Sequence, residues 1–428
     1  MKMLTVGKQI KVKAIDLDFK GQGVSKVDNY VIFTPGILVG EVALVEISQI
    51  KDRFAQANLI EVISISKDRV KDTSMLGSID LYHLSIDKQI QWQERITKET
   101  FSKIANKDIV LNDTITDDRF VYYRNKSVFH VLDEDTIKCG MYLKNYLLTE
   151  THQFILADKL TNKFLNIINR SMIPVEKNVI KHVAFRTNEQ NQILITFIAI
   201  KEKVKYLDLL VKRLSEYEEV VGITLNIKDH PKRIFGKKSI TLYKENKIIQ
   251  KLNQYDLPIN DRSFFQINYP VMRKVFEVIN THIEQHQVLV EAYSGIGVIG
   301  LSLIDKMKRM VMIESQHENV MMAKSILKNY MIKKIKVVEA KAEEVIDKYQ
   351  GDVLIVDPPR AGLMKKFIYK IKEMNFNEMI YLSCDVKTLA RDYKLLSDVY
   401  EITHIYPIRM FHHTISIETL VILKKKQS

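Results

Sequence analysis

A cysteine at the end of an apolar segment is the side chain of this sequence best suited to covalent chemistry. Cys384 follows the apolar run EMIYLS and precedes Asp385. A thiolate is the effective nucleophile among ordinary side chains, and it suits addition to carbon 6 of a uracil ring. The addition makes carbon 5 an enolate carbon that attacks a sulfonium methyl group, and a base must then remove the carbon 5 proton so that the thiol can leave. For Cys139, the other cysteine, burial as an inert small side chain is the default interpretation.

An aspartate stiffened by two prolines ends the preceding apolar segment. Asp357 follows DVLIV and precedes Pro358, Pro359 and Arg360. Its carboxylate suits a hydrogen bond from the N3–H of a uracil or from a donor on a cofactor, while a strand-capping surface aspartate is the alternative when the motif is taken alone. The carboxyl ends of parallel strands lie at one edge of a sheet, so Asp357 and Cys384 are predicted to be neighbours.

A short glycine-rich turn follows an earlier apolar segment. Gly295 and Gly297 frame the turn after QVLVEAY, and the next apolar segment ends at Glu314. In sheets that bind nucleotide-like ligands, such glycines let the backbone approach the ligand at a helix N-terminus, and an acid about 20 residues on binds ribose hydroxyls. The pattern favours nucleotide-like ligand binding over a purely structural turn.

Regular alternation of apolar strands and amphipathic helices from about Phe265 predicts the element that positions these residues. Near-continuous apolar strands separated by helices indicate a parallel, doubly wound α/β sheet of the Rossmann-like kind. Its ligand is expected beyond the carboxyl ends of the strands. The predicted strands are QVLVEAY, RMVMIES, KIKVVEA, DVLIVDPP and EMIYLSC, with YEITHIYPIRM and ISIETLVILKKK as closing strands.

The rest of the chain divides into two further predicted domains. Residues 1–66 show short alternating strands with glycine turns, which indicates a small β-barrel of the oligonucleotide-binding (OB) type, although a barrel with only a packing role is the alternative. Residues 67–260 begin with a helical stretch near Ile86 to Ile104 and continue as a mixed α+β domain. Residues 261–428 form the third domain.

Composition limits the classes of partner and site. The formal net charge of +13 and a pI near 9.3 indicate a polyanionic partner, without distinguishing nucleic acid from acidic lipid. Two cysteines exclude a disulfide framework and a four-cysteine metal cluster within one chain, so no metal site is expected. Without a long apolar run or a signal-peptide pattern, we expect a cytoplasmic protein that does not enter a membrane. We also expect a monomer.

Two segments of the middle domain combine cations with aromatic residues. RFVYYRNK, at 119–126, contains Arg124 and Lys126, and KDHPKRIFGKK, at 228–238, contains Lys232 and Arg233. Cations of this kind neutralise phosphates while aromatic rings stack on bases. Aromatic residues on a sheet face are more often part of a core, so each segment alone supports RNA contact only weakly.

The motifs resemble the family of RNA 5-methyluridine methyltransferases represented by RumA and TrmA, from the N-terminal barrel to the last strand. YLSCDVKTLARD resembles the family's nucleophile motif SCNPxTLARD and assigns the nucleophile to Cys384. MFHHTISIETLVIL resembles DMFPHTxHVExVVLL, whose glutamate is the base, and this match assigns the base to Glu418. The resemblance implies a class I methyltransferase domain that uses S-adenosylmethionine.

The same resemblance assigns cofactor and RNA contacts. RSFFQIN resembles SFFQVN, whose glutamine contacts the cofactor, which gives that role to Gln266. Tyr293, Glu314 and Asp357 take the other cofactor-binding positions by the same match. YYRNK resembles the family's YRNK segment, and the barrel resembles its TRAM domain, an RNA-binding module. Both likenesses strengthen the expectation that the partner is RNA.

Several positions depart from the family pattern. Where many members have cysteines for an iron-sulfur cluster, this chain has Val70, Leu76 and Ile79, so no cluster is expected. Glu291 and Ser294 replace the usual Asp and Cys beside the glycine turn. Around the base, the replaced positions are Arg409, His412 and Ser416.

The leading hypothesis is therefore an enzyme that methylates carbon 5 of a uridine in a structured RNA. The ribosomal branch of the family more typically has a TRAM-like barrel, which favours 23S rRNA over tRNA. A non-catalytic RNA-binding or ribosome-assembly protein on the same fold is the main alternative, motivated by the changes around Glu418. Amino-group and cytosine-5 methyltransferases fit less well, because Arg360 follows the prolines where those enzymes have an aromatic residue or a cysteine.

Overall fold

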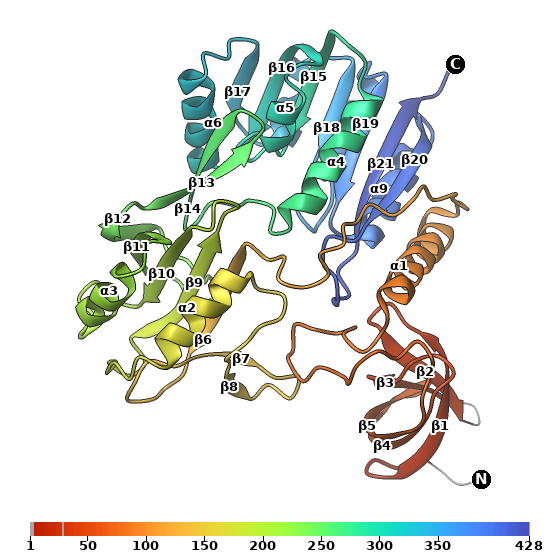
Figure 1. Ribbon diagram of the computed structural model, residues 1–428. Coiled ribbons are helices and arrows are strands. Elements are labelled where there is room, and N and C mark those ends of the chain that lie inside the picture. The colour runs from red at the N-terminus through yellow and green to blue at the C-terminus, as the bar shows by residue number, and fades with distance from the viewer. Residues whose placement is uncertain (1–3, 28–29, 428) are drawn as a thin grey trace.

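The computed structural model describes residues 4–27 and 30–427, which form three sheets and a hairpin joined in chain order (Figure 1). The first is a closed barrel with strand order β1-β2-β3-β5-β4. Buried and more exposed residues alternate along its strands, as expected where one face of each strand fills a barrel interior, and the predicted barrel is confirmed. Its strands are β1 (Gln9–Leu17), β2 (Gln22–Val27), β3 (Tyr30–Pro35), β4 (Val42–Ile50) and β5 (Phe54–Ser64).

A long helix follows the barrel, close to the predicted position. Helix α1 (Ile86–Thr100) continues into a π-helical turn, η1 (Phe101–Ala105). Its buried residues Trp92 and Ile96 share a hydrophobic cluster with helices of the C-terminal sheet. The first helix of the range 67–260 therefore packs with the C-terminal sheet, and the domain boundaries remain a prediction.

The middle of the chain forms a seven-stranded sheet with order β12-β11-β10-β9-β6-β7-β8. Helices α2 (Lys159–Asn169) and α3 (Leu207–Ser215) cover one face and share its core, with α2 in front of the sheet in Figure 1. The strands are β6 (Lys126–Val131), β7 (Cys139–Tyr142), β8 (Leu148–Glu150), β9 (Ile180–Thr187), β10 (Ile193–Ala199), β11 (Val220–Ile227) and β12 (Lys238–Lys244). The predicted α+β character is confirmed.

Apolar packing fills the region where the family's cluster cysteines would lie. Ile79 is buried in the core of the middle sheet, and Leu76 packs against that core. A hairpin of β13 (Lys247–Leu252) and β14 (Tyr255–Asn260) then leads into the C-terminal sheet.

The C-terminal sheet has the order β17-β16-β15-β18-β19-β21-β20, and its first five strands are parallel. The predicted doubly wound α/β sheet is confirmed. Strand β21 runs antiparallel to both β19 and β20, which the periodicity did not reveal. The strands are β15 (Gln287–Ala292), β16 (Met307–Glu314), β17 (Ile335–Glu339), β18 (Val353–Val356), β19 (Glu378–Ser383), β20 (Tyr400–Ile408) and β21 (Glu418–Lys425).

Helices cover both faces of this sheet with separate cores. The first set, whose apolar faces share one cluster with the β13–β14 hairpin, is α4 (Tyr269–His282), α5 (Val298–Ser302) and α6 (His317–Asn329). The second set packs with α1 on the other face and comprises α7 (Ala342–Val345), the 3-10 turn η2 (Ile346–Lys348), α8 (Lys365–Glu373) and α9 (Val386–Leu396). No helix among the described residues is long and apolar enough to cross a membrane.

Candidate active site

The nucleophile candidate lies in the turn between β19 and α9. Asp385 caps α9 by accepting hydrogen bonds from the backbone nitrogens of Lys387, at 2.9 Å, and Thr388, at 3.0 Å. The cap fixes the turn directly after the strand, as expected for an aspartate at a helix N-terminus. Cys384 is held just before it and is half-buried at the carboxyl edge of the sheet.

The base candidate comes to the same edge because β21 reverses direction. The antiparallel register pairs Ser383 with Thr419, so Cys384 and Glu418 lie next to that pair on neighbouring strands. Side chains at such positions are close enough to interact. Burial and the charges of Glu418 and Asp357 raise the pKa of the Cys384 thiol to about 11, against the opposing charge of Arg360.

A second carboxyl group completes an acidic cluster around the thiol. Asp357 follows β18, the strand beside β19, and burial raises its pKa to about 7. Burial and then the charge of Asp357 raise the pKa of Glu418 to about 8, while Arg360 opposes that rise. Carboxyl groups with such pKa values hold or release protons close to neutral pH, which suits proton transfer.

The glycine turn forms a cradle at the end of β15. Gly295 and Gly297 both have positive φ, at 57° and 85°. A Cβ atom on Gly295 would meet no atom within 4 Å, whereas one on Gly297 would lie 2.8 Å from the sulfur of Met312. The first glycine therefore borders open space where a ligand fits, while at the second the positive φ favours glycine and an added Cβ would displace the end of the Met312 side chain.

The residues around this cradle fit a nucleoside-like cofactor. Glu314 is buried at the end of β16 and accepts hydrogen bonds from the backbone nitrogens of Gly295, at 2.9 Å, and Gln316, at 2.6 Å. Each carboxylate oxygen keeps acceptor capacity for ribose hydroxyls. The buried hydroxyl of Ser294 has no partner among the described residues, so it is available to a polar group of the cofactor.

The other cofactor-binding candidates approach from two sides. Tyr293, with φ of 62°, places its ring 5.8 Å from the ring of Phe367 on α8. Gln266 lies between β14 and α4, where its carbonyl accepts a hydrogen bond of 2.9 Å from Asn125. Phe264 is 66% exposed two residues earlier, although sequence reasoning did not single it out. Its exposure, which no local pattern reveals, makes it available to stack on a base.

Burial is unusual at Glu291, one of the departures from the family pattern. The side chain lies in β15 with an exposed fraction of 2%, and its Oε2 atom has no hydrogen-bond partner among the described residues. Burial, followed by the charge of Asp357, raises its pKa to about 8. The carboxyl is therefore mostly protonated at neutral pH.

The loop before the base candidate is held by the polar face of α1. Arg409 is fully buried and donates hydrogen bonds to Gln89, at 2.7 Å, and Gln93, at 3.2 Å. Gln93 in turn donates to the carbonyl of Ile408, at 2.9 Å. Burial lowers the pKa of Arg409 to about 10. Gln89 and Gln93 are site-supporting residues that sequence reasoning missed, since their four-residue spacing shows only that they share a helix face.

The substituted positions after Arg409 are also integrated into the fold. His412 is buried, its Nε2 atom lies 2.9 Å from the hydroxyl of Thr116, and its carbonyl accepts a 3.0 Å hydrogen bond from Tyr123. Ser416 is half-buried. The residues that differ from the family pattern near Glu418 thus lie in a packed loop.

The four predicted RNA contacts lie in two places. Arg124 lies near the rings of Phe154 and Phe411, at 5.9 and 6.0 Å, close to the loop before the base. Lys126 donates a hydrogen bond of 2.9 Å to the carbonyl of Asp261, and burial lowers its pKa to about 7. Lys232 and Arg233 are exposed in the loop between β11 and β12, whose Phe235 ring lies 4.6 Å from the ammonium group of Lys126.

Comparison with known proteins follows the same division of the chain. Residues 85–426 match the family model described as tRNA (Uracil-5-)-methyltransferase, and residues 4–60 match the TRAM domain model. An uncharacterized RNA methyltransferase of Staphylococcus epidermidis is 30% identical, over 97% of this chain and 97% of its own length. One from Fusobacterium nucleatum is 27% identical, over 99% of this chain and 97% of its own.

A solved structure has the same fold over nearly the whole chain. The Pyrococcus abyssi tRNA (uracil-54, C5)-methyltransferase, crystallised with S-adenosyl-L-homocysteine, has a TM-score of 0.78 and 20% identity, and the match covers 97% of this chain and 100% of that one. At that identity the likeness shows the fold. The family match spans most of the chain, and this protein therefore belongs to the tRNA (uracil-5-)-methyltransferase family, as an S-adenosylmethionine-dependent RNA (uracil-5-)-methyltransferase with an N-terminal TRAM domain.

Proposed function

We propose that this protein methylates carbon 5 of a specific uridine in 23S rRNA through a covalent adduct between Cys384 and carbon 6 of the base. The observation that carries the proposal is the pairing of β19 with β21, which brings Cys384 and Glu418 to one edge of the sheet beside Asp357. A nucleophile and a base on neighbouring strands are what addition and elimination at one ring require. The preference for rRNA over tRNA rests on the resemblance to the ribosomal branch of the family, and the experiment below separates the two substrates.

The reaction begins with the target uridine turned out of its stack, because carbon 6 is inaccessible within one. The thiolate of Cys384 forms a bond to carbon 6, and the electrons of the C5=C6 double bond move through carbon 5 onto the exocyclic carbonyl oxygen at carbon 4, which gives an enolate. S-Adenosylmethionine, when bound, supplies the methyl group that carbon 5 takes up. Glu418 then removes the proton from carbon 5, the C5=C6 bond re-forms, and the Sγ–C6 bond breaks.

The cofactor contacts are proposed for the residues of the cradle and its rim. Glu314 would accept hydrogen bonds from ribose hydroxyls, and Ser294 supplies an unpaired hydroxyl beside it. The remaining contacts are proposed for Gln266, Tyr293, Gly295, Gly297 and Asp357. Asp357 is also proposed to accept a hydrogen bond from the uracil N3–H, which its buried position and the effect of its charge on Glu418 support.

Three domains divide the work in this proposal. Residues 1–66 and 67–260 bind the RNA, with Arg124, Lys126, Lys232 and Arg233 as contacts, and residues 261–428 carry out the chemistry. Lys126 and Asn125 both hydrogen-bond to the chain between β14 and α4, so the RNA-binding surface joins the cofactor side of the site.

The decisive experiment measures methyl transfer from labelled S-adenosylmethionine into unmodified 23S rRNA and, separately, bulk tRNA, followed by nucleoside digestion. Wild type is expected to form 5-methyluridine in 23S rRNA, and Cys384→Ala is expected to form none. Cys139→Ala is the matched control, since Cys139 is fully buried in the middle domain and takes no part in the reaction. Methylation by Cys384→Ala would exclude the covalent mechanism, and labelling of tRNA alone would reassign the substrate.

The intermediate itself is also testable. In Glu418→Gln the base is absent, so the adduct is expected to persist as an RNA-linked band on a denaturing gel, with product formation reduced at least about 100-fold. Absence of both product and adduct in the wild type, together with tight RNA binding, would favour the alternative of a non-catalytic RNA-binding protein.

A further inference from the structure

The face of the middle sheet opposite α2 and α3 carries a ladder of basic side chains. On β6 and β9 the register pairs Lys126 with Arg186 and His130 with His182. Side chains alternate along a strand, and the intervening Phe129 lies in the core with the helices. The two basic pairs therefore share the face that the helices leave uncovered.

A cavity of about 390 Å³ lies over the histidine end of this ladder. Three rings form its wall: those of His130 and Tyr142 are 4.7 Å apart, and those of His130 and His182 are also 4.7 Å apart. The volume lies within the roughly 300 to 1,000 Å³ that small-molecule sites have. We name it the His130–His182 pocket; its other polar lining residues are Asp133, Asn178, Lys181, Lys228, Lys232 and Arg233.

One ring in this wall has an unused polar atom. His182 is 8% exposed, and its Nδ1 atom has no hydrogen-bond partner among the described residues. Burial and the neighbouring charges of His130 and Lys228 lower its pKa to about 4, so the ring is neutral near pH 7. A neutral, flat ring with a free nitrogen suits a nucleobase, which offers both a π face and hydrogen-bonding edges.

Cations surround the rings on the open side. Lys228 donates to the carbonyl of Arg233, and Lys181 donates to the amide oxygen of Asn178 at 3.2 Å, so both ammonium groups have neutral partners. Lys232 and Arg233 are exposed at the rim. Rings inside and cations outside match the two parts of a nucleotide, the base and the phosphate.

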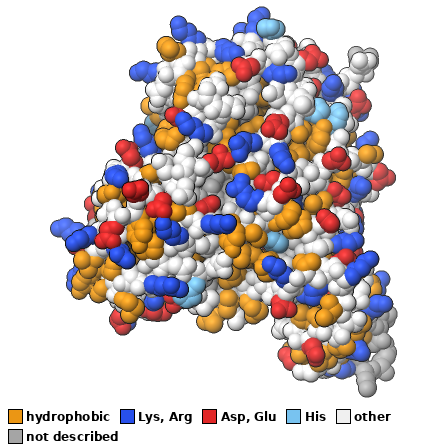
Figure 2. All heavy atoms as spheres, in the orientation of Figure 1, with side chains coloured by type: hydrophobic (Ala, Val, Ile, Leu, Met, Phe, Trp, Pro, Cys, Tyr) orange, Lys and Arg blue, Asp and Glu red, His pale blue; other side chains and the backbone are white. Residues whose placement is uncertain are grey.

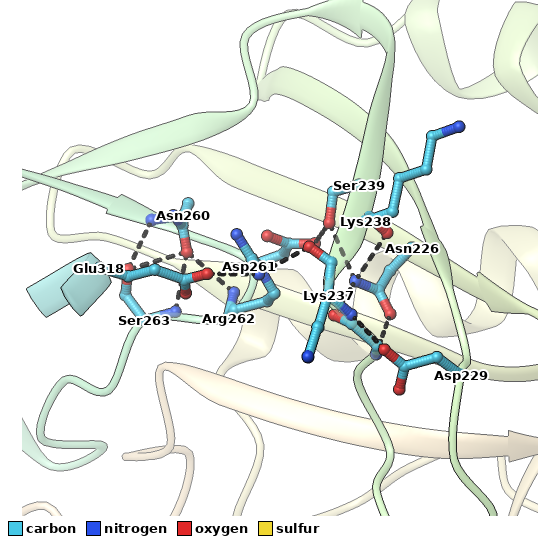
Figure 3. A network of polar contacts seen from close by, with 11 residues as sticks. Asn226, Asp229, Lys237, Lys238, Ser239, Asn260, Asp261, Arg262, Ser263 and Glu318 are labelled. Carbon is cyan, nitrogen blue, oxygen red and sulfur yellow. Dashed lines mark hydrogen bonds and ion pairs between the residues drawn. The ribbon is translucent and has the colours of Figure 1, made fainter. Parts of the chain in front are cut away.

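Hydrogen bonds of Asn226, labelled in Figure 3, join the two ends of the loop that carries Lys232 and Arg233. Asn226 accepts a 2.8 Å hydrogen bond from the nitrogen of Gly236 and donates one of 3.1 Å to its carbonyl. A Cβ atom at position 236 would lie 1.7 Å from the carbonyl oxygen of Ile227, so only glycine fits. The loop is thus held in place over the sheet rather than free to swing.

The pocket is also linked to the catalytic side. Asp261 accepts a 2.6 Å hydrogen bond from Ser239 of β12, visible in Figure 3, and one of 2.9 Å from Lys126. His130 is four positions after Lys126 on β6, which corresponds to about 13 Å along the strand. The row of paired side chains on β6 and β9 therefore runs from the pocket to the chain that enters the methyltransferase domain, where Arg186 is buried and Lys126 is held by Asp261.

We propose that the His130–His182 pocket binds one unpaired nucleotide of the substrate RNA, at a site separate from that of the methylated uridine. The rings of His130, Tyr142 and His182 hold the base, and the cations at the rim hold its phosphate. This inference rests on the proposed function, because the bound nucleotide belongs to the same RNA as the target.

The test uses the full-length protein and unmodified 23S rRNA. Lys232→Ala/Arg233→Ala is expected to raise the dissociation constant about tenfold and to reduce the slope of log Kd against log salt by about 2, since two phosphate contacts are lost. The Tyr142 side chain is 46% exposed, so Tyr142→Ala is expected to cost little stability. This variant is expected to raise the dissociation constant for the RNA at least about fivefold. In methylation assays these variants are expected to raise the RNA concentration that gives half-maximal rate and to leave the maximal rate unchanged.

The matched control is Lys324→Ala/Lys328→Ala, which removes the same charge from the exposed side of α6 and is expected to change binding less than twofold. Equal behaviour of the two double variants, with wild-type methylation intact, would refute the pocket while leaving the proposed function standing. Failure of wild type to methylate or to form an adduct would instead refute the proposed function.

A crosslinking experiment tests whether a nucleotide of the RNA occupies the His130–His182 pocket. RNA containing 4-thiouridine is expected to crosslink, on irradiation, to the peptide that contains His130 or Tyr142, and the crosslink is expected to disappear in Tyr142→Ala. Uridine or adenosine monophosphate at millimolar concentration is expected not to displace the RNA. Displacement by either mononucleotide at concentrations comparable to the RNA would assign the pocket to a free nucleotide and overturn the inference.

Discussion

At the scale of single residues, the site is dominated by acids whose protons are hard to remove. Burial raises the pKa values of Cys384, Glu418 and Asp357. The charge of Asp357 adds to the rise at Glu418, and the charges of Glu418 and Asp357 add to the rise at Cys384, because like charges in a poorly solvated position repel. Simultaneous ionisation of the Cys384 thiol and both carboxyl groups is therefore unfavourable. Arg360 is the neighbouring cation that opposes the rise at both Cys384 and Glu418. The reaction therefore depends on proton occupancy as much as on position.

The pH dependence follows from the pKa of about 8 at Glu418. Below that pKa the carboxyl is protonated and cannot take the carbon 5 proton, so the rate at saturating RNA is expected to rise with pH, at least about tenfold between pH 6.5 and 8.5. Single-turnover methylation with wild type measures it. Saturating RNA removes the effect of Lys126, whose charge falls as pH rises through about 7. A flat profile would contradict the assignment of Glu418 as base.

Glu291 predicts a second pH effect, on stability. Burial raises its pKa in the folded state to about 8, above the ordinary value of about 4.5 in the unfolded chain, so the folded state prefers the protonated carboxyl. Stability is therefore lost as pH rises from about 4.5 to 8. Glu291→Gln keeps the shape and cannot ionise. It is expected to stabilise the protein by about 4 kcal/mol at pH 8 and to change little at pH 4.5. Chemical denaturation at both pH values provides the measurement, and equal effects at both would exclude this explanation.

At the scale of elements, α1 acts as a support for the loop that precedes the base. Its buried Gln89 accepts from both Arg409, at 2.7 Å, and the nitrogen of His413, at 2.9 Å. Gln93 holds the carbonyl of Ile408 on the other side of the loop. Helix α1, which is far from this loop in the sequence, thus holds the loop between β20 and β21 that leads to Glu418, the proposed base.

Removing this support tests the role of α1. Gln89→Ala leaves the buried guanidinium of Arg409 without its shortest hydrogen bond, which is expected to cost roughly 1 to 3 kcal/mol of stability. The turnover number is expected to fall, with little change in the RNA concentration at half-maximal rate, because the base rather than the RNA surface is displaced. Gln91→Ala, on the exposed side of the same helix, is the control. Identical kinetics of the two variants would show that Gln89 of α1 does not position the loop before Glu418.

At the scale of the whole molecule, the chain carries a net charge of +13, and on the face shown in Figure 2 Lys and Arg side chains are mixed with Asp and Glu. We expect affinity for RNA to come from several separate phosphate contacts on different elements. Release of counterions at each of them makes such binding sensitive to salt.

The salt dependence of binding measures this property. The dissociation constant for 23S rRNA is expected to rise roughly 100-fold or more between 50 and 200 mM monovalent salt, as it does for proteins that neutralise several phosphates. A filter-binding titration at four salt concentrations gives the slope. A change of less than about threefold would mean that stacking and shape dominate, and that the net charge has little to do with RNA.

The sequence by itself determined the elements and the residues with intrinsic chemistry. The barrel, the α+β middle and the parallel sheet follow from local periodicity, and parallel strands necessarily bring Glu314, Asp357 and Cys384 to one edge. The role of Glu418 came from resemblance, since nothing local shows that the last strand turns back.

Only the tertiary structure decided which distant segments meet. The antiparallel pairing of β21 with β19, the docking of α1 beside Arg409, and the assembly of His130, Tyr142 and His182 into one wall depend on register and packing between segments far apart in the chain. Periodicity tells which face of a strand or helix is buried, but not which partner buries it. That choice is made by the fit of whole surfaces, and it exists only once the chain is folded.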